Sequence, residues 1–251
     1  MYMPEIISPS DIELAKLQAQ KMDVLYEELT TEEIEKLDQA LRRILKLYYP
    51  QREIVDLFLR RKVEIITGCM VAKKQFSKTF DGESPKAGNF GISITRAAYF
   101  GIGDDWDDAA PFSTGSPQNW IHSGTTLLGG TAGNPIKIGE NAVHVIIGIA
   151  SLHPSPKIES FKFKINGNEK PVITTGWLWR ASGIAIKELE KSLLLRKDMT
   201  VLCQVFISAK FGSSVDDIPY LVGVSYLPED VLKIHDPVDI VKTTAKVVLT
   251  T

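Results

Sequence analysis

Apolar residues recur at helical spacing along the first 62 residues, with charged residues between them. Ser8, Pro9 and Asp11 are typical of a helix start, because serine caps the first turn, proline tolerates its first position and aspartate favours its positive end. Thr30 and Glu33 have the spacing of a capping box and indicate the start of a second helix. Both signals place helices at the beginning of the chain.

The second helix has one apolar face and one charged face. Pro50 ends it and can begin a third helix, over about residues 51–61. Helices with a single apolar face must pack it against another surface, either the remainder of the chain or a neighbouring subunit. We predict a helical arm over residues 1–62 that docks in one of these two ways through a stripe of Ile34, Leu37, Leu41, Ile44 and Leu45.

Beyond residue 62 the pattern changes to short apolar runs separated by glycine-rich turns, and all 18 glycines lie at or after Gly68. Alternation of apolar and polar residues is clearest at residues 158–165, and Asn166-Gly167 behind it is a strong hairpin signal. We predict a short helix at residues 184–196, a turn or short helix after Pro228, and strands at residues 63–76, 90–95, 143–152, 158–165, 171–179, 200–209 and 220–227.

Strands joined by hairpin signals, with no internal repeat and no regular alternation of strand and helix, favour antiparallel pairing. We therefore predict an α+β fold, in which an N-terminal amphipathic helical arm at residues 1–62 precedes a body at residues 63–251. The body is predicted to be an antiparallel β-sandwich, jelly-roll-like, with one short inserted helix. Its loop at residues 99–139 is long, and loops of this length are typically functional or held by a partner. A Rossmann or barrel enzyme is not expected.

The composition is that of an ordinary soluble globular protein, with 44% hydrophobic and 24% charged residues. A net charge of −2 disfavours a protein that holds nucleic acid through bulk positive charge. Local basic runs could still contact the phosphates of packaged nucleic acid without reading its sequence. These runs consist of Arg60, Arg61, Lys62, Lys73, Lys74 and Lys78.

The first residues, the lengths of the apolar runs and the few cysteines favour a protein made and folded in the cytoplasm. The first residues lack the basic and apolar regions of a signal peptide, and no apolar run is long enough to cross a membrane. Cys69 and Cys203 lie in apolar runs and are predicted to be buried free thiols, with a disulfide between neighbouring strands as the alternative. We expect no membrane partner, and a place in the virion if the chain is a viral coat protein.

The most concentrated group of candidate site residues is acidic. Four carboxylates within five residues could bind calcium, which prefers oxygen ligands. The spacing of an EF-hand is absent, and the alternative is an acidic loop that stays in water or pairs with lysine or arginine across a subunit contact. This candidate calcium site consists of Asp104, Asp105, Asp107 and Asp108.

Other stretches are similar to known metal-binding or catalytic motifs but lack a residue that the motif requires. The stretch Gly139–His144 resembles the first metal motif of cupins, but Ile146 stands where that motif needs its second histidine. His144 is therefore interpreted as a core histidine with a hydrogen-bond partner. Ser123 beside His122 lacks the acidic partner and the nucleophile elbow of a hydrolase. We predict no catalytic residue, and an enzyme is not expected.

Two further groups of residues are candidates for contacts. Trp177 and Trp179 lie on one face of a predicted strand, where they could stack on a sugar or belong to the core or an interface. The apolar run at the C-terminus is predicted to form a strand that pairs with a sheet edge, of its own chain or of a neighbour, because an unpaired strand of this kind aggregates. This run includes Val247, Val248 and Leu249.

About 30 residues of the helical arm are similar to a known arrangement. Leu29–Asp38, followed by Arg42–Leu45 and Arg52–Asp56, resembles the N-terminal helical arm of encapsulin-type shell proteins. The rest of the chain departs from that pattern, since no long spine helix can be placed in it. The resemblance implies a shell protein in general rather than that particular fold.

These features together favour a self-assembling structural protein, such as a viral coat, capsid or shell subunit, whose main partner is another copy of itself. The first alternative is a ligand-binding or enzymatic β-sandwich, with the two tryptophans and the acidic loop as a carbohydrate or divalent-metal site. The second alternative is a component of a phage-like tail or tube.

Overall fold

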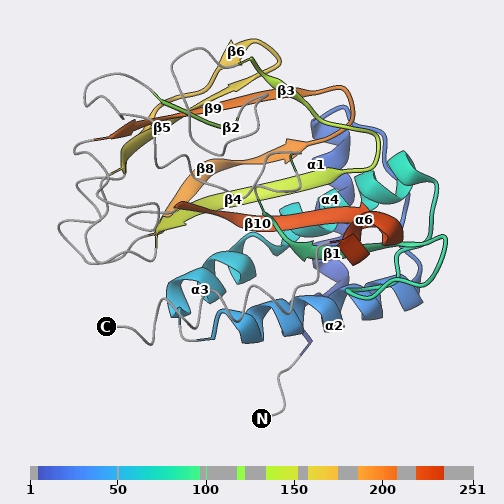
Figure 1. The fold of residues 1–251 in the computed structure, drawn as a ribbon. Helices are drawn as coiled ribbons and strands as arrows, with labels where there is room; N and C mark the ends of the chain where they lie inside the picture. The colour runs from blue at the N-terminus through green and yellow to red at the C-terminus, as the bar shows by residue number, and fades with distance from the viewer. Residues whose placement is uncertain are drawn as a thin grey trace. The chain divides into compact units, whose positions relative to one another are not determined.

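The computed structural model describes residues 5–49, 51–96, 100, 118–121, 134–151, 158–174, 186–207 and 219–234 (Figure 1). The chain divides into two compact units. Unit 1 comprises Met1–Ile94, Asn141–Val145 and Val224–Thr251, and unit 2 comprises Thr95–Glu140 and Ile146–Gly223. The helices therefore belong to unit 1.

Both predicted helix starts are confirmed. The Ser8 hydroxyl accepts a hydrogen bond from the Asp11 N–H, and the Asp11 carboxylate accepts one from the Ser8 N–H at 2.8 Å. Thr30 and Glu33 form the same reciprocal pair at the second helix. The third helix and the short helix after Pro228 are also present. The helices are α1 (Pro9–Lys21), α2 (Thr31–Leu47), α3 (Arg52–Arg60), α4 (Lys62–Phe76) and α6 (Glu229–Ile234).

The predicted strand at residues 63–76 is wrong, because this segment forms α4 and the helical region continues beyond residue 62. Residues 65–72 of this helix are all buried, so its sequence shows no single apolar face and its β-branched residues imitate a strand. The middle of α4 requires a glycine at position 68. A Cβ at this position would overlap Val145 and crowd Tyr226, so only glycine permits this approach of the helix.

The strands form two sheets. The four-stranded sheet has the order β1 (Phe90–Ile94), β10 (Pro219–Pro228), β4 (Val143–Ser151), β8 (Ile186–Leu195). The six-stranded sheet belongs to unit 2. Its main path is β2 (Gln118–Ile121), β9 (Thr200–Ile207), β5 (Ile158–Ile165), β6 (Asn168–Glu169), with β3 (Ile136–Lys137) beside β9 and β7 (Ile173–Thr174) beside β5.

Helices followed by an antiparallel, strand-rich body confirm the predicted α+β class. Every register given between two named strands is antiparallel, for example Phe90 opposite Pro228 and Phe163 opposite Cys203. The sandwich and jelly-roll arrangement of the body stays a prediction. The hairpin at Asn166-Gly167 is confirmed, and both residues have the positive φ, 50° and 77°, that a tight two-residue turn between β5 and β6 requires.

The predicted inserted helix at residues 184–196 is also wrong, since the structure has strand β8 there. Leucine, lysine and glutamate favour helices in isolation, and the spacing of the leucines fits a helical face. In the strand, Leu189 and Leu195 are the buried residues, and they lie on the same face because they are an even number of positions apart. Pairing with the apolar strand β4 outweighs the helical preference of this segment.

Candidate functional site

The apolar stripe of α2 is covered within its own chain. Leu37, Leu41, Ile44 and Leu45 are at most 3% exposed in the isolated chain, and they form part of the core of unit 1. Ile34 is only half-buried and lines a surface groove. The stripe that was predicted to dock in cis or on a neighbour therefore docks in cis, and contacts with a neighbour must use other side chains.

Glu33 fixes the position of α2 against α4 and the segment before β1. Its Oε2 accepts hydrogen bonds from the Thr30 N–H at 2.8 Å and from Lys73 Nζ at 2.7 Å, and its Oε1 accepts one from the Phe80 N–H at 3.0 Å. Burial of the Glu33 carboxyl opposes its charged form, but these hydrogen bonds and the Lys73 charge outweigh burial and lower its pKa. One carboxylate thus joins three segments of unit 1.

A second carboxylate holds the N-terminal segment on α2. Asp38 Oδ1 accepts hydrogen bonds from the Ile6 N–H at 2.7 Å and the Ile7 N–H at 2.9 Å. Asp38 Oδ2 accepts a hydrogen bond from Nε of Arg42, one helical turn further on. Lys62 Nζ binds the same N-terminal segment through the Ile6 carbonyl at 2.9 Å. Residues preceding α1 are therefore fixed beside α2.

Several cations that were candidates for phosphate contacts have carboxylate partners in the chain. Arg61 pairs with Glu64 at 2.9 Å, and Lys62 pairs with Asp11 at 2.7 Å. Lys73 pairs with Glu33. Lys62 and Lys73 thereby join separate helices, and Arg61 pairs within the first turn of α4. These pairs reduce the positive charge that the predicted basic runs could offer to nucleic acid.

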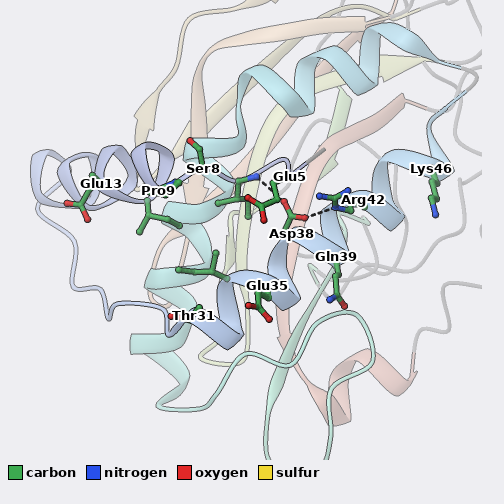
Figure 2. Close-up of a pocket in the computed structure, with 13 residues that line it drawn as sticks. Glu5, Ser8, Pro9, Glu13, Thr31, Glu35, Asp38, Gln39, Arg42 and Lys46 are labelled. Atoms are coloured by element: carbon green, nitrogen blue, oxygen red, sulfur yellow. Dashed lines mark hydrogen bonds and ion pairs between the residues drawn. The ribbon is translucent and has the colours of Figure 1, made fainter. Parts of the chain in front are cut away.

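The N-terminal segment, α1 and α2 enclose an open groove with a volume of about 800 Å³ (Figure 2). Its apolar lining comes from Ile7, Pro9, Ile12 and Ile34. Figure 2 shows Glu13 and Lys46 at opposite ends of the groove, with Asp38 and Arg42 between them. Exposed carboxylates of Glu5, Glu13 and Glu35 also line it. The groove therefore has an apolar floor with exposed carboxylates along it and a lysine at one end.

Large apolar side chains are exposed beside this groove, on α1 and on the residues that follow it. α1 packs on α4 through small side chains, because Ala15 and Ala19 are fully buried. The two leucines of α1 consequently point outward, and together with two apolar residues that follow the helix we call them the α1 patch. The α1 patch consists of Leu14 and Leu17, each 51% exposed, with Met22 at 42% and Leu25 at 78%.

A second apolar surface lies where α2 meets α3, and Figure 1 shows α1 and α3 well apart. Leu47, Tyr49 and Leu59 are 49%, 63% and 40% exposed there, and we call these three residues the α2–α3 corner. Lys46 directly precedes Leu47, and Arg52 lies two helical turns before Leu59 on the same side of α3; both are exposed. The corner therefore has charges of both signs beside its apolar side chains, because exposed Asp56 lies between Arg52 and Leu59 on that side of α3.

His144 lies in the core of unit 1 and not at a reactive surface. Its Nδ1 shares a hydrogen bond of 2.8 Å with Ser225 Oγ, and both residues are 0% exposed. A nucleophile and its base need access to a substrate, which this histidine and serine lack. The interpretation of His144 as a core histidine with a partner is confirmed. Burial lowers the pKa of His144 to about 3.

This buried imidazole predicts a specific dependence of stability on pH. In the unfolded chain His144 binds a proton below about pH 6.5, whereas in the folded chain it stays neutral down to about pH 3. Folding is therefore weakened as the pH falls through this window. Between pH 8 and pH 5 the histidine should lower the free energy of unfolding by about 2 kcal/mol, at about 1.4 kcal/mol per pH unit below pH 6.5.

Urea unfolding of wild type and His144→Gln at both pH values measures this contribution. The glutamine variant does not titrate in this range, so its loss of stability between pH 8 and pH 5 should be smaller than that of wild type by about 2 kcal/mol. Equal losses in the two proteins would show that His144 is protonated in the folded state.

The remaining candidates divide into those that the structure describes and those that it does not. Cys69 and Cys203 are buried free thiols, as predicted, and burial raises the pKa of each. No group of three or more potential metal ligands occurs among the described residues. Several predicted site residues lie outside the described residues, and the hypotheses about them stay predictions: Asp104, Asp105, Asp107, Asp108, Trp177, Trp179, Val247, Val248 and Leu249.

The groove and both apolar patches were not recognised in the sequence. The groove depends on Asp38 binding backbone N–H groups about 30 residues away, for which no local pattern exists. The α1 patch had a readable signal, since Ala15 and Ala19 mark a close helix contact and Leu14 and Leu17 lie off that face. Within the described parts of the chain, no helix has both the length and the apolar character needed to cross a membrane.

Comparison with known proteins gives little similarity. No family model and no curated protein matches this chain. The insecticidal delta-endotoxin Cry8Ea1 from Bacillus thuringiensis, a solved structure, aligns with 59% of this chain at 12% sequence identity and a TM-score of 0.24. The chain spans about a quarter of the length of that toxin chain, 25%. A likeness this low supports no argument about fold or function, so the function must be inferred from the surfaces of the chain itself.

Proposed function

We propose that this chain is a self-assembling structural subunit, of the kind that builds viral coats or other protein shells. The observation that supports the proposal is the exposure of seven large apolar side chains of unit 1, between 40% and 78%, in the α1 patch and the α2–α3 corner. Single exposed apolar residues are normal, but grouped ones mark interaction sites. The partner that suits a subunit with two such surfaces is another copy of the same chain.

Two separate surfaces are what a multi-subunit assembly requires. A single self-complementary patch gives a closed dimer, whereas two patches on different sides allow each copy to contact two neighbours. Contacts with two neighbours permit a ring, a tube or a shell. A viral coat or shell is the first candidate, because the helical arm resembles that of shell proteins in its sequence. A phage-like tube remains the second candidate, and particle shape distinguishes the two.

Substitution of each patch tests the proposal. Wild type should have a mass several times that of the 27.9 kDa chain in size-exclusion chromatography with light scattering. Leu14→Ser/Leu17→Ser and Leu47→Ser/Tyr49→Ser should each lower that mass, with the fold retained, because surface changes of this kind cost roughly 0.5 kcal/mol each.

Val172→Ser is the matched control, since Val172 is 52% exposed but lies in unit 2, outside both patches. This variant should assemble like wild type. The proposal is contradicted if wild type is a monomer, or if both patch variants assemble with the mass of wild type.

A further inference from the structure

We infer that Asn166 is a site of spontaneous deamidation, at which the backbone nitrogen of Gly167 displaces the side-chain amide as ammonia. These two residues form the tip of the β5–β6 hairpin in unit 2, so the inference does not depend on the surfaces proposed for assembly. Both residues are exposed, and water therefore reaches the turn. They are the one Asn-Gly pair in the sequence, and glycine hinders attack by its own nitrogen least because it has no Cβ.

The nitrogen that attacks is free of the hairpin ladder. The ladder between β5 and β6 ends with Ile165 opposite Asn168, which leaves Asn166 and Gly167 as the two-residue loop. Within the part of the chain that the structure describes, the Gly167 N–H donates no hydrogen bond. No hydrogen bond must therefore break before this nitrogen approaches the side-chain carbon of Asn166.

The side-chain carbonyl of Asn166 is held by the start of β9. The Thr200 N–H donates a hydrogen bond to Asn166 Oδ1 at 2.8 Å, and the Asn166 N–H donates one to the Thr200 carbonyl at 2.9 Å. Negative charge collects on Oδ1 when a nitrogen adds to Cγ, and a fixed backbone N–H stabilises such charge. Asn166 Nδ2 has no hydrogen-bond partner among the described residues, so the leaving amide is unrestrained. The turn thus provides a free nucleophile, a polarised carbonyl and a free leaving group.

The reaction requires only water and hydroxide. The Gly167 nitrogen loses its proton to hydroxide and bonds to Asn166 Cγ, while the bond between Cγ and Nδ2 breaks and Nδ2 takes a proton from water to leave as ammonia. The product is a succinimide ring, which a water molecule opens. Attack by water on Cγ gives aspartate, and attack on the backbone carbonyl carbon of residue 166 gives isoaspartate. Nothing is oxidised or reduced, and the hairpin gains one negative charge at neutral pH.

The two products differ in how they fit the hairpin. Aspartate keeps the length of the backbone and tolerates the positive φ of 50° at position 166, and its carboxylate can accept the same hydrogen bond from the Thr200 N–H. Isoaspartate adds a methylene group to the main chain and so lengthens a turn that has only two residues. The aspartate product should therefore keep the pairing of β5 with β6, and the isoaspartate product should lose it.

Incubation of the folded wild-type protein in mildly alkaline water enriched in heavy oxygen tests the inference. Peptide mass spectrometry should show the amide of Asn166 replaced by a carboxyl group that contains heavy oxygen, at least as fast as in the same chain unfolded in guanidinium chloride. Asn168 is the internal control, because it is exposed in the same hairpin but precedes Glu169, and it should keep its amide. An intact Asn166 in the folded protein, after the unfolded chain has reacted, would show that the hairpin protects this residue and would overturn the inference.

The identity of the product and one variant test the route and its consequence. Isoaspartate must be present among the products, because direct hydrolysis of the side-chain amide by water gives aspartate alone; aspartate without isoaspartate would contradict attack by the Gly167 nitrogen. Asn166→Asp reproduces the aspartate product and should unfold at the same urea concentration as wild type, since it keeps the acceptor for the Thr200 N–H. Unfolding of this variant at a clearly lower urea concentration would show that the hairpin does not tolerate the modification.

Discussion

Leu41→Asp should leave unit 1 unfolded at neutral pH. Leu41 is 2% exposed in the buried stripe of α2. Its replacement removes roughly 1.5–3 kcal/mol of apolar burial. It also places a carboxylate beside the buried apolar side chains of Leu37, Ile44 and Leu45, at a further cost of several kcal/mol, about the stability of a whole domain. The same change tests whether the helical arm is part of the core, since an arm docked only on a neighbour would leave the isolated chain folded.

Leu47→Asp on the same helix is the matched control, because Leu47 is 49% exposed at the end of α2. Circular dichroism and urea unfolding of the two variants should show a folded control, within about 1 kcal/mol of wild type, and an unfolded Leu41→Asp protein. If Leu41→Asp unfolds in urea at the same concentration as wild type, the stripe is not buried within the chain.

Glu33→Ala should lower the free energy of unfolding by about 3–5 kcal/mol, the usual cost of removing one partner of a buried ion pair. Lys73 is then left with a charge in a side chain that is only 12% exposed. The N–H groups of Thr30 and Phe80 lose their acceptor in the same change. Because the Glu33 carboxylate joins three segments of unit 1, its removal weakens the contacts of all three, and the expected loss of stability is correspondingly large.

The effect of Glu33 should also depend on pH. The pKa of Glu33 is lowered in the folded chain, so its contribution is complete above the ordinary pKa of 4.5 and is lost as the pH falls through the folded value. Urea unfolding of wild type and Glu33→Gln should therefore give stabilities that converge in acid. Glu32 is the neighbouring carboxylate, and its side chain is 75% exposed. Glu32→Ala should therefore lower the free energy of unfolding by less than about 1 kcal/mol. Equal costs at positions 32 and 33 would contradict the assigned role of Glu33.

Local signals in the sequence predicted those parts of the fold that local chemistry determines. The capping residues Ser8 and Thr30 fixed two helix starts, and Asn166-Gly167 fixed a hairpin, because each acts on backbone groups within a few residues. α4 and β8 were predicted wrongly for one common reason. A fully buried helix has no polar face, and an edge strand rich in leucine and glutamate resembles a helix, so tertiary packing decided both.

The candidate surfaces were predictable only in part. The sequence identified the apolar stripe that includes Leu37 and Leu41, but burial in cis depends on where α4 and β1 lie, which no local pattern gives. The groove requires the distant hydrogen bonds of Asp38. The corner arises because α2 ends at Leu47 with apolar residues on its outer side, where an isolated pattern cannot tell an exposed leucine from a buried one.

The mass of the unmodified chain in solution tests the central claim most directly. Sedimentation velocity over a wide range of protein concentration should show species much larger than 27.9 kDa, with larger species increasing as the concentration rises, because the proposal gives each copy two neighbours. A single species of 27.9 kDa at every concentration would contradict self-assembly and with it the proposed function.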